Sequence, residues 1–230
     1  MDNFINFDKI VLCLIEVDDN IMSVFNSNII LFILAYLLGS FPSGLIVGLI
    51  FFKKDIRNFG SGNIGTTNTF RILGPKAGIA VLFADVFKGW LAVNLFKLCH
   101  IHVVNLVLLI TGLLAILGHT FSIFLKFKGG KAVATIAGVL FAYNFNFALV
   151  CATIFLPMIF ITSCISLSAL ISIVIIFIVS FLFHDIYLSI LLGFLVLLVY
   201  IRHRSNIIRL INGKENIIHF GLFYWYRKIK

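Results

Sequence analysis

The stretch Ile165-Ser-Leu-Ser-Ala-Leu-Ile-Ser-Ile-Val-Ile-Ile-Phe-Ile-Val-Ser-Phe-Leu-Phe183 contains no charged residue, no proline and no glycine. Its length is close to the ~20 apolar residues that a helix needs to cross the hydrocarbon core of a bilayer. The rest of the chain has the same character, because 61% of its 230 residues are hydrophobic and 12% are charged. An ordinary soluble domain has roughly 25% charged residues. The sequence therefore predicts an integral membrane protein.

Further apolar runs alternate with polar connections along the chain, and they lack the period-two alternation of barrel strands. Backbone groups inside lipid must be satisfied within helices or a closed barrel, so we expect an all-α, polytopic helical bundle. About seven transmembrane helices are predicted, over residues 29–52, 76–98, 103–125, 132–146, 147–163, 165–183 and 186–201. The fourth and fifth are short and adjoin at Tyr143-Asn-Phe-Asn146, so a six-span bundle or one re-entrant feature is the alternative.

Lysine and arginine concentrate in residues 53–76, residues 126–131 and the segment from 202 onward, which together hold 15 of the 18 cations. Cytoplasmic loops of membrane proteins are enriched in these residues. We therefore predict that the three segments are cytoplasmic, with the N-terminus outside and the C-terminus in the cytoplasm. This topology and the anionic lipid surface account for the net charge of +9, so a lipid bilayer is the expected partner and nucleic acid is not.

The two ends of the chain differ in composition from its centre. Residues 1–28 form an atypical acidic extension, in which five carboxylates accompany the single cation Lys9. Translation from Met22 instead of Met1 is an alternative explanation for most of it. Residues 217–230 form a basic, aromatic tail, predicted to be cytoplasmic, and the transmembrane domain is assigned to residues 29–216.

The first polar segment is Arg57-Asn-Phe-Gly-Ser-Gly-Asn-Ile-Gly-Thr-Thr-Asn-Thr-Phe-Arg71. Its small residues let backbone N–H groups approach an anion closely, and hydroxyl and amide side chains lie beside them. A phosphate-binding loop is the prediction. Its candidate residues are Arg57, Ser61, Gly62, Asn63, Thr67, Asn68 and Arg71.

Two more polar segments carry groups that suit a phosphate. Lys126-Phe-Lys-Gly-Gly-Lys131 precedes an apolar run, where a helix N-terminus favours negative charge, and its candidates are Lys128, Gly129, Gly130 and Lys131. In the third segment, His203 and Asn206 are three residues apart, with Arg209 near the same helical face. Because all three segments are predicted on one side of the membrane, we expect one composite site for phosphorylated substrates.

Other polar residues are candidates for the same site. Asp85 and Lys88 lie three residues apart within the second span, where one charge costs roughly 2.5–3.5 kcal/mol, so they form either a structural pair or one that lines the site. His119, Ser166 and Ser168 lie near span ends on the predicted cytoplasmic side, and they either face the site or pack between helices. Glu215 is expected to be a structural ion-pair partner. The isolated cysteines do not predict a metal site.

Several motifs occur together in a specific order. They are Gly39-Ser-Phe-Pro-Ser-Gly44, Gly60-Ser-Gly-Asn-Ile-Gly-Thr-Thr-Asn68 with Arg71 and Gly74, Asp85-Val-Phe-Lys-Gly89, Gly118-His-Thr-Phe-Ser122, Phe127-Lys-Gly-Gly-Lys-Ala-Val-Ala-Thr135, and His203-Arg-Ser-Asn-Ile-Ile-Arg-Leu-Ile-Asn-Gly-Lys-Glu215. Over residues 29–216 the chain thereby resembles the bacterial acyl-phosphate-dependent glycerol-3-phosphate acyltransferases, the PlsY family.

The resemblance implies a seven-span enzyme of the bacterial inner (cytoplasmic) membrane whose active site faces the cytoplasm. Such an enzyme transfers a fatty acyl group from acyl phosphate to the sn-1 hydroxyl of glycerol 3-phosphate. The products are lysophosphatidic acid and phosphate, in the first step of membrane phospholipid synthesis. The resemblance implies no cofactor, and it implies the enzyme that supplies acyl phosphate as a partner.

Residue roles follow from the resemblance at matching positions. Ser61 and Arg71 would be essential, Gly129, Gly130 and Lys131 would form the glycerol-phosphate loop, and His203 and Asn206 would be a functional pair, with Glu215 structural. The chain departs from the family pattern around residues 161–169, where an arginine is expected near Ser163, so the role of Ser168 is open. Either His203 or a substrate phosphate oxygen could accept the proton of the acceptor hydroxyl.

A transporter or channel for a phosphorylated solute is the competing class, since basic loops and a buried Asp85/Lys88 pair would serve it as well. That class predicts inverted repeats with broken helices in matching halves. The sequence has no such repeat, although Gly39–Gly44 interrupts the first expected span.

Overall fold

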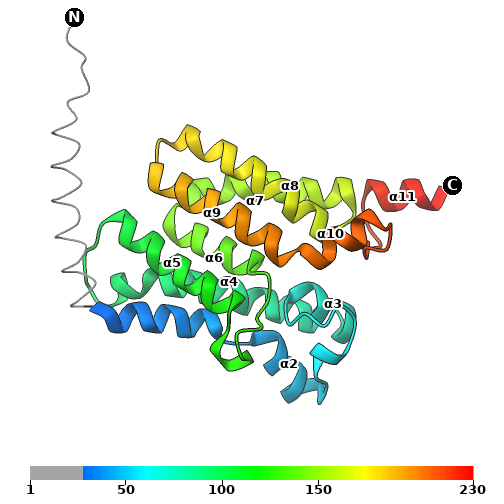
Figure 1. Ribbon diagram of the computed structural model, residues 1–230, viewed down its shortest axis with the longest axis horizontal. Coiled ribbons are helices and arrows are strands. Elements are labelled where there is room, and N and C mark those ends of the chain that lie inside the picture. Colours follow the sequence, from blue (N-terminus) through cyan, green and yellow to red (C-terminus); the bar gives the residue numbers. More distant parts are fainter. Residues whose placement is uncertain (1–27, 230) are drawn as a thin grey trace, which may run out of the picture.

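The computed structural model describes residues 28–229, and the regular elements within that range are all helices (Figure 1). The longer helices are Asn28–Ser40, α2 (Ser43–Phe52), α3 (Thr66–Leu73), α4 (Pro75–Leu98), α5 (Asn105–Thr120), α6 (Val133–Tyr143), α7 (Phe145–Thr162), α8 (Ile165–Ser180), α9 (Ile186–Arg202), α10 (Arg204–Ile211) and α11 (Leu222–Ile229). Short 3₁₀ turns occupy Ile56–Asn58, Ile123–Leu125 and Phe181–Phe183. The predicted acidic extension lies outside the described residues, except for Asn28.

Four helices within residues 28–229 are long and apolar enough to cross a membrane. They are Pro75–Leu98, Asn105–Leu125, Phe145–Thr162 and Ile165–Phe183. The number rises to six if each of two bent pairs, Asn28–Ser40 with Ser43–Phe52 and Ile186–Arg202 with Arg204–Ile211, forms one span. The all-α bundle with several membrane helices is therefore confirmed, whereas the count of seven and the orientation of the termini stay predictions.

The first expected span, residues 29–52, is not one continuous helix. It bends by 49° between Ser40 and Ser43, where Pro42 precedes α2 and cannot donate a backbone hydrogen bond. The carbonyl groups freed at the break find partners elsewhere, because Ser122 Oγ donates to the Ser40 carbonyl at 2.6 Å and Lys88 Nζ donates to the Phe41 carbonyl at 3.0 Å. The break is thus satisfied inside the bundle.

The boundary between the fourth and fifth expected spans also differs from the prediction. α6 ends at Tyr143 and α7 begins at Phe145, with Asn144 between them. Asn144 Oδ1 accepts the Phe147 N–H at 3.0 Å, so this asparagine caps α7. Of the two asparagines at the predicted boundary, Asn144 therefore separates the two helices, and Asn146 lies within α7. α6, with 11 residues, is only about 16 Å long.

Small residues bring α4 and α6 into close contact. A side chain at Gly89 would overlap the Thr135 carbonyl, and one at Gly138 would overlap the Val86 carbonyl. Such close backbone approach is a common basis of helix association in membranes. The ends of α9, α10 and the start of α8 lie toward the same end of the bundle as α3, at the right of Figure 1. The polar loops therefore gather at one end of the molecule.

Candidate active site

A chain of hydrogen-bonded side chains joins distant parts of the sequence at this end of the bundle. The Lys131 ammonium donates to Asn206 Oδ1. Asn206 Nδ2 donates to Ser166 Oγ at 2.7 Å and to Glu215 Oε1 at 2.9 Å. Arg209 Nε donates to the other carboxylate oxygen, Glu215 Oε2, at 2.7 Å. The amide of Asn206 thus connects the loop before α6, the start of α8 and the segment after α10.

The surroundings of Lys131 favour loss of its proton. Burial is the main cause that lowers the pKa of the Lys131 ammonium to about 8; the positive charges of Arg209, Arg202 and Arg71 act in the same direction, and Glu215 acts against them. One carboxylate therefore faces several cations. An anion bound among them would relieve their mutual repulsion, and a phosphate group carries suitable charge.

His203 lies at the junction of α9 and α10, which meet at a 61° bend. Its side chain is almost fully buried, with 2% of its surface exposed, and Nδ1 lies 2.8 Å from the Val199 carbonyl oxygen. A carbonyl oxygen can only accept, so Nδ1 carries the hydrogen and Nε2 of the neutral ring keeps its lone pair. The His203 carbonyl accepts the Asn206 N–H at 2.8 Å, which sets the first turn of α10.

The backbone of Gly129 and Gly130 is fully engaged. The Gly129 N–H donates to the Thr120 carbonyl at 3.1 Å, and the Gly130 N–H donates to the His119 carbonyl at 3.0 Å. On the other side, Arg202 donates to the carbonyls of Gly129 at 2.8 Å and Gly130 at 3.2 Å. The predicted anion cradle of these two N–H groups is therefore corrected. Glycine is needed here because a side chain would overlap His119 or Thr120, and the loop instead positions Lys131.

Asn68 holds the first polar loop in place. It is almost fully buried, its Nδ2 donates to the carbonyls of Ile56 and Phe59 at 3.1 Å each, and its Oδ1 accepts the Ser61 N–H at 2.9 Å. Its amide is thus occupied by loop backbone, which revises its predicted contact with a substrate. The consequence is that Ser61 sits on an ordered loop with its own side chain exposed.

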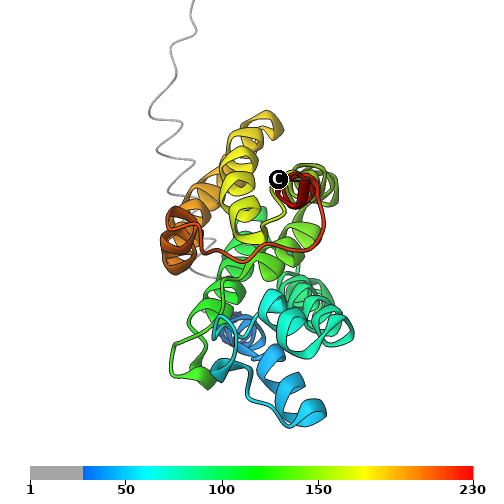
Figure 2. The ribbon, with the colours of Figure 1, turned by 90° about the vertical axis from the view of Figure 1, so that its right-hand side faces the viewer.

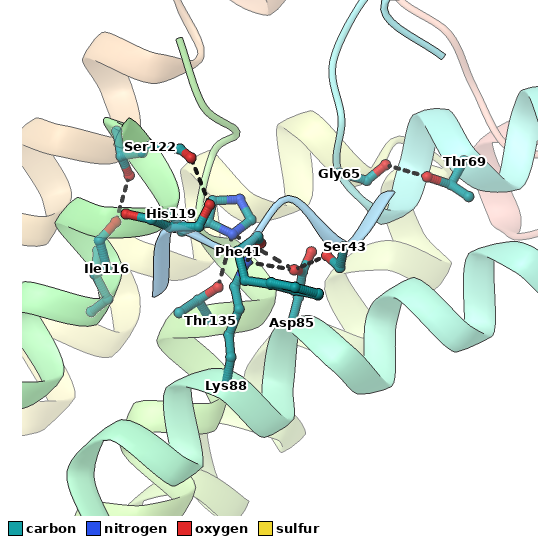
Figure 3. A network of polar contacts seen from close by, with 12 residues as sticks. Phe41, Ser43, Gly65, Thr69, Asp85, Lys88, Ile116, His119, Ser122 and Thr135 are labelled. Carbon is teal, nitrogen blue, oxygen red and sulfur yellow. Dashed lines mark hydrogen bonds and ion pairs between the residues drawn. The ribbon is translucent and has the colours of Figure 1, made fainter. Parts of the chain in front are cut away.

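A buried ion pair lies behind these loops (Figure 3). Lys88 Nζ lies 2.8 Å from Asp85 Oδ1, and Ser43 Oγ donates to the same oxygen at 2.5 Å. Since Lys88 also donates to the Phe41 carbonyl, the pair joins α4 to the break before α2. The pair is therefore structural in this arrangement, which is one of the two roles expected from the sequence.

His119 connects the ion pair to the second loop (Figure 3). Its Nδ1 lies 3.1 Å from Thr135 Oγ1 and 3.7 Å from Asp85 Oδ1. The opposite edge of the ring adjoins Gly130, where a side chain would overlap Nε2. His119 therefore packs directly beneath the residue before Lys131.

Comparison with known proteins identifies the family. A protein-family model described as glycerol-3-phosphate acyltransferase matches residues 29–213. The chain belongs to this family. The relative "Glycerol-3-phosphate acyltransferase 2" of Lactobacillus johnsonii is 64% identical over 200 residues, covering 87% of this chain and 92% of the relative. The Lactobacillus acidophilus protein of the same name is 61% identical over 195 residues, covering 85% of this chain and 92% of the relative.

Solved structures of the glycerol-3-phosphate acyltransferase family share this fold. The crystal structure of PlsY (YgiH), an integral membrane glycerol 3-phosphate acyltransferase, in its glycerol 3-phosphate form has a TM-score of 0.76 and 36% identity, covering 84% of this chain and 96% of that one. Its lysophosphatidic acid form has a TM-score of 0.73, also at 36% identity, covering 83% and 95%.

Within this acyltransferase, the two serines of α8 that the sequence analysis singled out, Ser166 and Ser168, make different contacts. Ser166 contacts Asn206 and also donates to Glu215 Oε1 at 3.0 Å. Ser168 is fully buried, donates to the Cys164 carbonyl at 2.9 Å and lies 2.8 Å from Thr162 Oγ1. Residues two apart on a helix point about 200° away from each other. Ser166 therefore belongs to the network around Asn206, whereas Ser168 is held by α8 and Thr162, and the substrate contact predicted for Ser168 stays a prediction.

The arginines that bracket the first loop differ in a similar way. Arg57 forms an ion pair of 2.6 Å with Asp55, and this hydrogen-bonded arginine lowers the pKa of the Asp55 carboxyl. Arg71, in the last turn of α3, instead contributes its charge at Lys131. Arg57 is thus already partnered, and Arg71 is the better placed of the two for an anion at the site.

The structure places the remaining predicted residues as follows. Lys131, Asn206, Arg209 and Glu215 meet in one network, and Glu215 has the predicted structural contacts. The other predicted residues are exposed or half-buried, and their substrate roles stay predictions: Gly62, Asn63 and Lys128 lie in loops, and Thr67 lies in the first turn of α3.

Sequence reasoning missed Ser43, Thr135 and the loop contacts of Arg202. Ser43 and Thr135 lay within motifs quoted for the family resemblance, but small hydroxyl residues in apolar helices give no signal of their own. Arg202 lay in the third polar segment, where its charge suggested a phosphate contact. Its partners, the carbonyls of Gly129 and Gly130, are 73 and 72 residues away in the sequence, respectively.

Replacement of Asp85 by asparagine should strongly destabilise this acyltransferase. The Asp85→Asn variant leaves the Lys88 ammonium buried without its countercharge, and breaking a buried pair costs roughly 3–5 kcal/mol. The thermal unfolding midpoint of purified protein in detergent measures the effect. The double variant Asp85→Asn/Lys88→Met should recover much of the loss, because no unpaired charge remains.

The exposed pair offers a matched control. Asp55→Asn makes the same chemical change beside Arg57, where a surface pair is worth about 0–1 kcal/mol, so the midpoint should barely move. Equal midpoints for Asp85→Asn and the double variant would contradict the structural role of the buried pair.

Proposed function

We propose that this protein transfers a fatty acyl group from acyl phosphate to the sn-1 hydroxyl of glycerol 3-phosphate, releasing lysophosphatidic acid and phosphate. The observation that carries the proposal is the network in which Lys131, Asn206 and Glu215 meet. This network gathers cations at one end of an apolar bundle. Solved structures of the family are described in glycerol 3-phosphate and lysophosphatidic acid forms. A phosphorylated acceptor fits the charge of this site.

In the proposed reaction the acceptor hydroxyl oxygen attacks the acyl carbon, and the bond from that carbon to the phosphate oxygen breaks. Negative charge develops on the carbonyl oxygen and on the departing phosphate. Preorganised donors stabilise such charge without reorganising, and we assign Arg71 and Lys131 to the phosphates and Ser61 to the reacting end of the donor. His203 or a phosphate oxygen of the substrate takes the hydroxyl proton.

We also propose the membrane arrangement that this chemistry requires. α6 would be added to the six spans named above, giving seven membrane helices. It is shorter than the hydrocarbon core, and the polar residues at its two ends, Lys131 before it and Asn144 after it, would reach the two membrane surfaces. The site would face the cytoplasm across the bacterial inner membrane, since the basic loops lie at that end. The lipid-soluble donor would then come from the bilayer, supplied by a partner enzyme, and the water-soluble acceptor from the cytoplasm.

The donor is tested by supplying labelled glycerol 3-phosphate to purified protein together with acyl phosphate, acyl-CoA or acyl-carrier protein in parallel. We expect labelled lysophosphatidic acid with acyl phosphate alone. Product from acyl-CoA instead would overturn the proposed donor. If no donor gave product, uptake of glycerol 3-phosphate into proteoliposomes would support the competing transporter hypothesis.

Lys131 should impose a basic limit on activity. If its ammonium binds the acceptor phosphate, kcat/KM for glycerol 3-phosphate should fall as the pH rises through about 8, where the free protein loses this charge. Between about pH 6, where the phosphate of the acceptor itself titrates, and pH 8 the ammonium is present and kcat/KM should be level. The measurement is kcat/KM at saturating acyl phosphate over a range of pH.

Two variants test whether Lys131, and not another group, causes the decline of kcat/KM at basic pH. Lys131→Arg keeps a permanent charge, so the basic decline should disappear even if activity is lower. Glu215→Gln removes the carboxylate that raises the pKa of Lys131, so the decline should begin at lower pH. A decline that is identical in all three proteins would show that another group causes it.

His203→Gln tests the general base. If Nε2 accepts the hydroxyl proton, this variant should lose mainly kcat, on the order of 10²–10⁴-fold, with little change in KM. His184→Gln, at an exposed turn between α8 and α9, is the matched control and should behave as wild type. A change confined to KM would contradict His203 as the general base and favour a phosphate oxygen of the substrate.

A further inference from the structure

The chain after Glu215 is tied to the end of α7. The Ile218 N–H donates to the Ser163 carbonyl at 2.8 Å, and the Tyr224 N–H donates to Ser163 Oγ at 3.0 Å. Only two residues separate Glu215, which is held in the site, from Ile218. This tail follows the part of the chain that the family model matches, residues 29–213. The segment is therefore ordered and anchored next to the site.

An aromatic cluster fixes α11 on α7. The ring of Phe160 lies 5.4 Å from that of Phe220 and 5.7 Å from that of Trp225, and the Phe220 and Trp225 rings are 5.9 Å apart, all three pairs edge to face. Gly221 makes the turn between them with φ +104°, a conformation that favours glycine. Such aromatic pairs stabilise the contact beyond the burial of their area.

This contact sets the depth of α11 relative to the membrane. α7 has 18 residues and is about 27 Å long, close to the ~30 Å hydrocarbon core that it would cross. It is the least buried of the four candidate spans, so it faces lipid at the rim of the bundle. Figures 1 and 2 show α11 continuing past the end of α7 along the long axis of the bundle. In a bilayer that α7 crosses, α11 would therefore lie at the level of the lipid headgroups.

The surface of α11 has the composition of an interfacial element. Tyr226 is 58% exposed and Ile229 is 86% exposed, and Trp225 keeps 44% of its surface exposed despite its contacts. The cations Arg227 and Lys228 follow in its last turn and are also exposed. Tryptophan and tyrosine favour the membrane interface, and basic side chains there are attracted to acidic lipids.

We propose that α11 is a binding surface for the membrane itself, with its aromatic side chains among the lipid glycerol groups and Arg227 and Lys228 on acidic headgroups. The occupant is the bilayer around α7, because the exposed face of α11 is continuous with the lipid-facing end of that helix. Binding would steady the tail from Ile218 back to Glu215. The proposal concerns membrane contact, and it stands or falls independently of the proposed acyl transfer.

The test uses tryptophan fluorescence in vesicles. The chain has two tryptophans, so Trp90→Phe leaves Trp225 as the single reporter in full-length protein. The protein is placed in phosphatidylcholine, or in phosphatidylcholine with phosphatidylglycerol, carrying bromine either near the glycerol end or near the middle of the acyl chains. We expect bromine near the glycerol end to quench more strongly, and brominated phosphatidylglycerol to quench more strongly than brominated phosphatidylcholine.

Charge variants identify the groups that recognise acidic lipid. In Arg227→Gln/Lys228→Gln the preference for brominated phosphatidylglycerol should disappear, because the two cations are gone. Lys53→Gln/Lys76→Gln removes two exposed cations, one after the end of α2 and one in the first turn of α4, and the preference should persist.

Two results would overturn the proposal. The first is quenching of Trp225 by aqueous iodide and by neither brominated lipid, which would place α11 in water and favour a protein partner. The second is equal quenching by acidic and neutral brominated lipid in the protein that keeps Arg227 and Lys228, which would exclude acidic headgroups as their partners.

Discussion

The ion pair between Lys88 and Asp85 is the interaction on which the site depends. Two buried charges in an apolar bundle are tolerated only when they are paired and hydrogen-bonded, and here their remaining bonds reach Ser43 and the Phe41 carbonyl. The pair therefore fixes the break in the first membrane segment against α4. Through His119 and Thr135 it also supports the loop that presents Lys131.

A second constraint is the imbalance of charge at the site. Glu215 is one carboxylate among several cations, and it is shared by Asn206, Ser166 and Arg209. The amide of Asn206 can donate to the carboxylate and accept from the Lys131 ammonium at the same time, which neither a carboxylate nor an ammonium could do. The site is thereby held together while its positive charge stays uncompensated, and this is the condition for binding an anion.

Particular residues show how far sequence reasoning reached. The apolar runs predicted most of the long helices to within a few residues. The second and third polar segments meet as expected, through Lys131 with Asn206 and Arg202 with Gly129 and Gly130. Gly129 and Gly130 were singled out as N–H donors to an anion. In the structure they permit close packing, and their N–H groups donate to carbonyls of α5. Asn68 and Ser168 donate to backbone carbonyls, which the sequence did not indicate, because an amide or hydroxyl suits a substrate and a backbone carbonyl equally well.

The sequence by itself determined the membrane class, the all-helical architecture and the family, because apolar length and motif order are local properties of the chain. Only the tertiary structure decided which polar groups are already satisfied and which remain available. Ser166 was separated from Ser168 by the partners that each side chain meets. Arg57 was separated from Arg71 by its ion pair with Asp55, whereas the charge of Arg71 acts on Lys131. Such partners lie tens of residues apart, so no local pattern records them.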